Sequence, residues 1–241
     1  MLFACMRAEL MKLKRSFIWS VFLILPVIST IMGCFNYIQN TDIVGVSWYS
    51  LWTQTTLFYS NFFYAPLIAV YCAYLWRLEN FNRNRNALLA APVPIPCLYL
   101  AQFLAISCVT QLWVGVLFLI CGLITGLQGF PPLDTIIWLL RGCVGGLAIA
   151  ALQLFFSSFI RSFALPIAMA LLGSVAGLLF SSAGFGLFFP YSLMLLGMNS
   201  NKEEDVLAGS FLPFFLSCGI FLLIFLWCGI RYLKKTDVKA Y

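Results

Sequence analysis

Histidine is absent from this chain of 241 residues, and only 9% of its residues carry a charge. Histidine is the commonest general base and a frequent metal ligand, so its absence argues against proton relays and histidine-bound metal centres. Soluble domains contain about a quarter charged residues. The low charge therefore excludes an ordinary soluble domain and leaves no room for a separate catalytic domain.

The usual catalytic and cofactor-binding patterns are also missing. The sequence contains no Walker-type phosphate loop, no Gly-x-Ser-x-Gly and no His-Glu-x-x-His. Its nine cysteines are scattered through apolar stretches and include no Cys-x-x-Cys pair, which is typical of small buried hydrophobes rather than of a disulfide framework or zinc site. We therefore expect no enzymatic activity and no cofactor or metal in this chain.

Long apolar runs dominate the sequence, of which 63% is hydrophobic. A helix crosses a membrane with about 20 apolar residues. Six runs are long enough, which predicts an all-α polytopic membrane protein with six transmembrane helices. The runs are 17–35, 56–76, 97–125, 134–159, 162–182 and 211–232. No acidic residue lies in the middle of a run, so transport energy is expected to come from another subunit.

Basic residues are distributed unequally between the segments that join these runs. With the N terminus inside, twelve of the fourteen Lys and Arg fall on the inner side, whereas Lys202 lies outside and Arg141 lies within a run. Because orientation follows Lys and Arg in short connections, both termini are predicted to be cytoplasmic. The net charge of +6 then reflects topology, and we expect no nucleic-acid partner.

Residues 1–16 predict a basic amphipathic helix at the cytoplasmic interface. Phe3, Met6, Leu10, Leu13 and Phe17 recur at helical spacing and share one narrow arc. Two compatible roles remain open, an elbow that contacts a cytosolic partner and an anchor that contacts only lipid. The cations of this helix are Arg7, Lys12, Lys14 and Arg15.

The most polar inner segment is 77–96, between the second and third runs. Residues 79–90 are predicted to form a short helix, and Pro92, Pro94 and Pro96 are expected to prevent helix and impose an extended turn. The polar side of this helix suits contact with another protein, while Leu88 and Leu89 suit packing on the bundle. A solvated loop is the simpler interpretation of its composition.

The apolar stretch 183–198 suggests a seventh crossing, but that would place the basic C-terminal segment outside. We therefore predict an outer re-entrant or interfacial hairpin within the segment 183–210, broken by Gly184, Gly186 and Pro190. Arg141 lies about 10 Å deeper than Asp134 on nearly the same helix face. For Arg141, snorkelling or pairing with a neighbouring polar group is favoured over contact with a substrate.

Three Gly-x-x-x-Gly pairs occur within the apolar runs. Such pairs let helix backbones approach closely, and we favour packing inside one subunit over dimerisation. They lie at positions 122/126, 142/146 and 173/177.

Together these elements resemble the permease subunits of ABC-2 type transporters, most closely the lantibiotic self-protection (immunity) permeases. That family has an interfacial N-terminal helix, six spans with both ends inside, a cytosolic coupling helix after the second span and an outer re-entrant hairpin before the sixth. The N-terminal pattern is matched by Glu9, Leu10, Lys12, Leu13, Lys14 and Arg15. The coupling pattern is matched by Glu79, Asn84, Asn86, Leu88, Leu89, Pro92, Val93 and Tyr99, and the hairpin pattern by Pro190, Tyr191 and Ser192.

The resemblance implies one transmembrane domain over residues 1–241 in the bacterial cytoplasmic membrane. It further implies a cytosolic ABC ATPase subunit in two copies, which binds ATP and Mg²⁺, and a second permease, identical or homologous. The coupling-helix residues implied to contact the ATPase are Glu79, Asn82, Arg83, Arg85, Asn86, Leu88 and Leu89.

The implied substrate is a cationic antimicrobial peptide, expelled from the membrane to confer immunity. A possible substrate path comprises Trp48, Trp52, Tyr59, Arg141, Phe189 and Tyr191. An interfacial aromatic belt accounts for the aromatic residues equally well. The alternatives are a non-transporting sensor or scaffold that binds peptide or lipid, and an ABC-2 exporter of lipid or small molecules.

Overall fold

Helices make up the regular structure of the residues that the computed structural model describes, which are 1–14, 16, 18–80, 93–110, 112–200, 202, 204–209 and 211–235. The longer helices are α1 (Leu2–Lys14), α2 (Ile18–Gln39), α4 (Trp48–Phe58), α5 (Tyr64–Asn80), α7 (Ile95–Thr110), α8 (Leu112–Ile124), α9 (Leu133–Phe159), α10 (Ala164–Ser182) and α12 (Phe211–Lys235). The shorter elements are α3 (Thr41–Val44), the π-helix η1 (Tyr59–Phe63), the 3₁₀ turns η3 (Gly186–Phe188) and η4 (Pro190–Ser192), and α11 (Leu193–Gly197).

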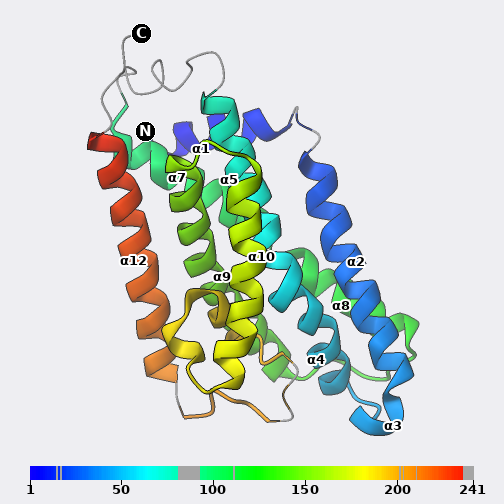
Figure 1. Ribbon diagram of the computed structural model, residues 1–241. Helices are drawn as coiled ribbons and strands as arrows, with labels where there is room; N and C mark the ends of the chain where they lie inside the picture. Colours follow the sequence, from blue (N-terminus) through cyan, green and yellow to red (C-terminus); the bar gives the residue numbers. More distant parts are fainter. Residues whose placement is uncertain are drawn as a thin grey trace.

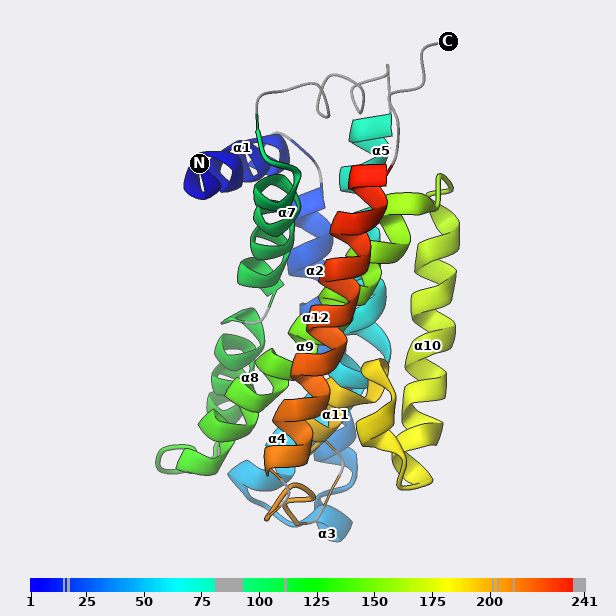
Figure 2. The same cartoon turned by 90° about the vertical axis from the view of Figure 1, so that its left-hand side faces the viewer.

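The helices form one bundle around α9, which packs against α5, α7, α11 and α12 (Figure 1). The helix α1 lies across one end of this bundle, and α12 ends at the same end (Figure 2). The helix α3 lies at the opposite end, together with residues 186–197, which we call the η3–α11 segment (Figure 1). The bundle therefore has two distinct ends, which we call the α1 end and the hairpin end.

Five helical stretches are long and apolar enough to cross a membrane. They are 18–39, the continuous stretch 48–80 formed by α4, η1 and α5, and then 133–159, 164–182 and 211–235. Large apolar side chains such as Leu172 and Leu223 are exposed on their outer sides. Such a surface suits contact with lipid, because lipid chains are as apolar as leucine.

The five stretches match five of the six predicted runs, with differences at their ends. The second run begins at Trp48 rather than at residue 56. Ser47 caps this helix by accepting a hydrogen bond from the Ser50 backbone N–H at 3.0 Å, so the aromatic residues before 56 belong to the helix. The third run consists of two shorter apolar helices, α7 and α8, of which α8 continues from the end of α7 (Figure 2).

The expected effect of the alternating prolines on the third run is wrong in part. The helix α7 begins at Ile95 and contains Pro96, while the Pro94 carbonyl accepts hydrogen bonds from the N–H groups of Cys97 and Leu98. The first turn of a helix tolerates proline because its N–H groups have no partner within the helix. Of the segment 77–96, residues 77–80 continue α5, and residues 81–92 lie outside the described residues.

The apolar arc predicted for the N-terminal helix is partly exposed in α1. Phe3, on the predicted apolar arc, is 82% exposed, and Met6 and Leu10 are half-buried. The deeply buried residue of this helix is instead Glu9, on the side that faces the bundle. The face of α1 that carries Glu9 therefore packs against the bundle, and Phe3 is left exposed.

Glycines allow the η3–α11 segment to approach α9 and α10 closely. A Cβ atom on Gly145 would lie 2.6 Å from the backbone of Leu193, and one on Gly197 would lie 2.7 Å from the backbone of Arg141. On α10, Gly173 and Gly177 leave space for Tyr191. These glycines of α9 and α10 therefore serve packing inside one subunit.

We expect Gly145→Ala to lower the free energy of unfolding by about 2 kcal/mol, because the new methyl group meets backbone that cannot rotate away. Gly219→Ala in α12 is the matched control, since its Cβ would meet no atom within 4 Å. Thermal unfolding of the purified variants measures both effects. Equal midpoints for the two variants would contradict the close approach of α11 to α9.

Candidate functional site

At the α1 end, one lysine joins two buried carboxylates. The Lys12 Nζ atom lies 2.7 Å from Glu9 Oε1 and 2.5 Å from Glu79 Oε1. Glu9 is 1% exposed and Glu79 is 4% exposed, whereas the Lys12 side chain is 32% exposed. Glu79 lies in the last turn of α5, so this contact, which we call the Lys12 bridge, fastens α1 to the end of the stretch 48–80.

In the Lys12 bridge, one ammonium group lies between two glutamate side chains. Burial raises the pKa of Glu9, even though the charge and hydrogen bond of Lys12 oppose that change. Burial acts to lower the pKa of Lys12, but the two glutamates outweigh it and raise that pKa above its ordinary value. Lys12 therefore stays protonated, and both glutamates bind its single ammonium group. A buried arrangement of this kind depends on every member being in place.

The Lys12 bridge lies directly before the segment 81–92. Of the residues predicted to contact an ATPase, Glu79 is buried and paired with Lys12, two positions before this segment. Asn82, Arg83, Arg85, Asn86, Leu88 and Leu89 lie outside the described residues. Among the predicted interfacial cations, Arg7 is exposed and Lys12 forms the bridge; the structure describes the backbone of Lys14 within α1, and Arg15 lies outside the described residues.

At the hairpin end, Arg141 pairs with an acid from a distant part of the chain. The Arg141 Nη2 atom lies 2.9 Å from Asp205 Oδ2, and the guanidinium carbon lies 5.3 Å from the centre of the Phe211 ring. Arg141 is 3% exposed, whereas Asp134 is exposed. Arg141 therefore forms the structural pairing that the sequence favoured, and its partner comes from the segment between α11 and α12.

Asp205 collects several hydrogen bonds besides that of Arg141. The Trp138 indole N–H donates to Oδ2 at 3.3 Å, and the Leu207 backbone N–H donates to Oδ1 at 3.1 Å. Burial acts to raise the pKa of Asp205, but these hydrogen bonds and the charge of Arg141 hold it below the ordinary value. The carboxylate thus stays ionised. It joins the loop that precedes α12 to Arg141 and Trp138 of α9.

The η3–α11 segment is bound to the bundle through polar contacts that are buried. The Gln153 amide Nε2 lies 2.6 Å from the Tyr191 hydroxyl, and the Trp52 indole N–H donates to the Met198 carbonyl at 2.7 Å. The Ser200 hydroxyl lies 3.0 Å from the hydroxyls of both Thr56 and Ser60. We call these contacts, together with those of Asp205 with Arg141, Trp138 and Leu207, the hairpin lock.

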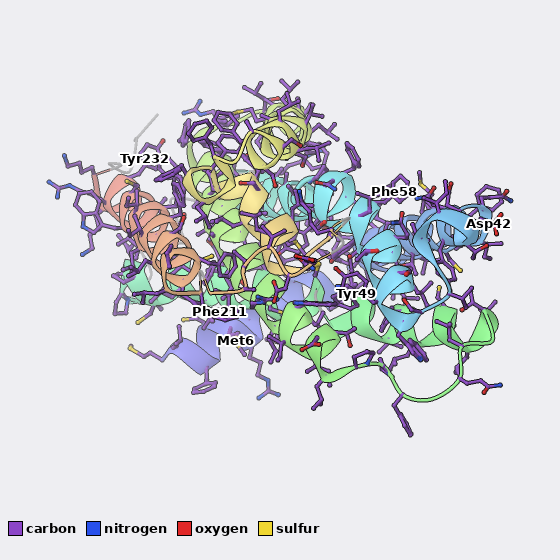
Figure 3. The ribbon with its side chains drawn as sticks, turned by 90° about the horizontal axis from the view of Figure 1, so that it is seen from below. Met6, Asp42, Tyr49, Phe58, Phe211 and Tyr232 are labelled. Carbon is purple, nitrogen blue, oxygen red and sulfur yellow. The ribbon has the colours of Figure 1, made fainter. Side chains whose placement is uncertain are left out.

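Most of the predicted substrate-path residues belong to this packing. Trp52, Tyr59 and Tyr191 are buried, and Trp48 and Phe189 are half-buried. Trp48 and Trp52 both pack edge-on against Phe118, whereas Phe189 packs against Tyr191. Seen from the hairpin end, Tyr49 and Phe211 lie over the middle of the bundle and Asp42 lies at its edge (Figure 3).

Sequence reasoning missed the polar side of the hairpin lock. Thr56, Ser60 and Ser200 are each at most 3% exposed, yet none was singled out. A signal was available, because the apolar stretch 48–80 contains a run of Ser, Thr, Gln and Asn between 50 and 61. Polar side chains within a membrane span are costly unless they find partners, so such a run indicates contact with another polar segment.

Both sites lie on the same helical stretch. Its first half carries Trp52, Thr56 and Ser60 of the hairpin lock, and its last turn carries Glu79 of the Lys12 bridge. The π-helix η1 and Pro66 interrupt its α-helical hydrogen bonding between the two sites. The stretch 48–80 therefore joins the Lys12 bridge to the hairpin lock within one run of helix.

Comparison with known families decides the identity of this bundle. Residues 5–177 match the sequence model of the family described as ABC-2 family transporter protein. The chain belongs to the ABC-2 transporter family. As an ABC-2 permease it is an integral membrane component of an ABC transporter, not catalytic itself, and it works with an ABC ATPase. No significant match is found among curated proteins or solved structures.

Proposed function

We propose that this ABC-2 permease is the transmembrane subunit of an ATP-driven exporter that expels a lantibiotic or similar cationic antimicrobial peptide from the bacterial cytoplasmic membrane. In this proposal the chain crosses the membrane six times, with α7 and α8 together forming the third crossing, and the α1 end is cytoplasmic. Two ATPase copies and a second permease, identical or homologous, complete the transporter.

The Lys12 bridge is the observation that carries the proposal. It fastens an interfacial helix to the last turn of α5, immediately before the segment 81–92 that would bind the ATPase. A cytosolic motor pushing on 81–92 would then move α1 and the stretch 48–80 as one unit. At the far end, this stretch contacts the hairpin lock, so the motion would reach the side from which substrate leaves.

The choice of a cationic amphipathic peptide rests on the hairpin end. Glu204 is exposed there, while Asp205 is occupied by Arg141. Large apolar side chains surround this end, with Phe188 at 77% and Phe185 at 59% exposure. An exposed acid and exposed aromatic rings at the same end suit a ligand that is both cationic and apolar. A lipid or small-molecule exporter shares the fold and the motor, so the substrate itself must be tested.

Association with the ATPase is tested by copurification. We expect the double variant Arg83→Ala/Arg85→Ala to lose at least about 80% of the ATPase that copurifies with the wild-type permease, because both cations lie in the proposed coupling helix. Arg161→Ala, an exposed cation in the connection between α9 and α10, is the control and should retain the ATPase. Full retention by the double variant would refute the coupling role of 81–92.

A non-transporting sensor or scaffold is the remaining alternative, since the basic helix α1 would serve it equally well. Cells that express the permease and ATPase separate the two functions. Export requires that resistance to the peptide vanish when the ATPase cannot hydrolyse ATP. Resistance that persists without hydrolysis would support a scaffold that only binds the peptide.

A further inference from the structure

The outward face of α12 changes abruptly from apolar to basic near the α1 end. Leu216, Ile220, Leu223 and Trp227 follow one another at intervals of three or four residues and are 54–67% exposed. Arg231 and Lys234 continue the same column and are also exposed. At 100° per residue, these six positions fall within an arc of about 80°, so they form one stripe along the helix.

The basic end of this stripe is a shallow surface depression lined by five residues of α12. They are Trp227, Ile230, Arg231, Lys234 and Lys235. The Arg231 guanidinium carbon lies 5.0 Å from the centre of the Trp227 ring, which holds one cation beside the depression. Figure 3 shows α12 at the edge of the bundle, with side chains projecting away from the other helices.

Nearby acids do not neutralise these cations within the described part of the chain. The carboxylates described at the α1 end, Glu9 and Glu79, both bind Lys12. Ion pairs among the described residues involve only Lys12 and Arg141 as cations. In the sequence, the last eleven residues contain Arg231, Lys234, Lys235 and Lys239 against a single acid, Asp237. The depression therefore carries a net positive charge that calls for an anion from outside the chain.

The length of the stripe matches that of a phospholipid in one leaflet. From Ile220 to Ile230 the helix rises about 15 Å, which is half the thickness of the hydrocarbon core. A phospholipid lying along α12 would place its acyl chain on Leu223 and Ile220 and its phosphate among Arg231, Lys234 and Lys235. We propose that this stripe binds one anionic phospholipid of the cytoplasmic leaflet, with its phosphate and negatively charged headgroup held by the three cations.

The proposal is tested with the full-length permease in detergent, titrated with phosphatidylglycerol or phosphatidylcholine of identical acyl chains and observed by native mass spectrometry. The test variant is Arg231→Gln/Lys234→Gln. The control, Arg77→Gln/Arg161→Gln, also removes two exposed cations at the same end, and Arg77 likewise lies over an aromatic ring, that of Phe163.

We expect the wild type to prefer phosphatidylglycerol, and the test variant to bind it about 25-fold more weakly, since each cation near an anionic headgroup contributes about fivefold. The control should stay within about twofold of the wild type. Brominated phosphatidylglycerol should quench tryptophan fluorescence in the wild type, and Trp227→Phe should remove the saturable part of that quenching.

Four results would overturn the proposal. The first is equal affinity for the two lipids, and the second is an equal loss in test and control variants. The third is displacement of phosphatidylglycerol by inorganic phosphate at millimolar concentration, which would identify a site for free phosphate. The fourth is a test variant that keeps its lipid but loses the ATPase on copurification, which would identify the patch as a protein contact. This test does not depend on the exported substrate, so it can fail while the proposed function stands.

Discussion

Replacing Lys12 by methionine is expected to abolish ATP-driven transport and to lower the free energy of unfolding by about 3 kcal/mol. The variant leaves Glu9 and Glu79 buried together without a cation between them. Burial leaves both carboxylates poorly solvated, and the ammonium group of Lys12 no longer offsets that cost. Peptide transport in vesicles measures the loss of transport, and thermal unfolding of the purified permease measures the loss of stability.

Two further variants separate stability from transmission. Arg7→Met removes an exposed cation from the same helix and should change the unfolding midpoint little. The triple variant Glu9→Gln/Lys12→Met/Glu79→Gln leaves no buried charge and should regain most of the lost stability. Transport should nevertheless stay low, because α1 is no longer fastened to α5. Recovery of transport together with stability would reduce the Lys12 bridge to a structural contact.

The second large effect is expected at the hairpin end. Arg141→Met should destabilise the protein by about 3 kcal/mol, because it leaves Asp205 with a partly buried charge and removes the cation packed on Phe211. Asp205→Asn should cost a similar amount, since the buried guanidinium loses its only carboxylate among the described residues. The double variant should cost less than the sum of the two single changes, with a coupling energy of about 1.5 kcal/mol or more.

Asp134→Asn is the natural control for this cycle. Asp134 lies on nearly the same face of α9 as Arg141, yet it is exposed and the ion pair is formed with Asp205. Its replacement should change stability by no more than about 0.5 kcal/mol. A larger effect of Asp134→Asn than of Asp205→Asn would contradict the observed pairing.

Acid should weaken the same contact. The pKa of Asp205 is lower in the folded protein than its ordinary value of 3.8. A lowered folded pKa means that Asp205 contributes its stability above the ordinary value and loses it as pH falls through the folded pKa. Unfolding midpoints measured down the pH scale should fall more steeply in the wild type than in Asp205→Asn. Parallel curves would show that the pKa of Asp205 is the same in the folded and unfolded protein.

The long apolar runs in the sequence were sufficient to predict where the long helices lie, because runs of this length have few alternative folds. They were insufficient to predict the residues at which the helices begin and end. The polar run between 50 and 61 concealed the start at Trp48, and Pro96 fits the first turn of α7 that it was expected to prevent. Both errors come from local hydrogen bonding at helix termini, which average hydrophobicity does not describe.

The sites were predictable only in part, because their partners are distant in the sequence. The basic residue Lys12 and the acid Glu79 were both singled out, but their contact spans 67 positions. Arg141 was expected to snorkel or to pair with a polar group, but the sequence did not identify Asp205 as its partner. Tyr191 was noted for its place in a motif, whereas its contacts with Gln153, Gly173 and Gly177 emerge from packing. Such pairings depend on how helices dock, which the periodicity of one sequence does not encode.

We propose that this permease exports a cationic peptide with energy from a partner ATPase. The most direct measurement follows a fluorescent lantibiotic in vesicles that contain the permease and its ATPase, with ATP supplied on the α1 side. We expect ATP hydrolysis to move the peptide from the membrane to the hairpin side, and Lys12→Met to stop this movement. Peptide that binds without ATP-dependent movement, in vesicles where the ATPase hydrolyses ATP, would show that the permease does not export it.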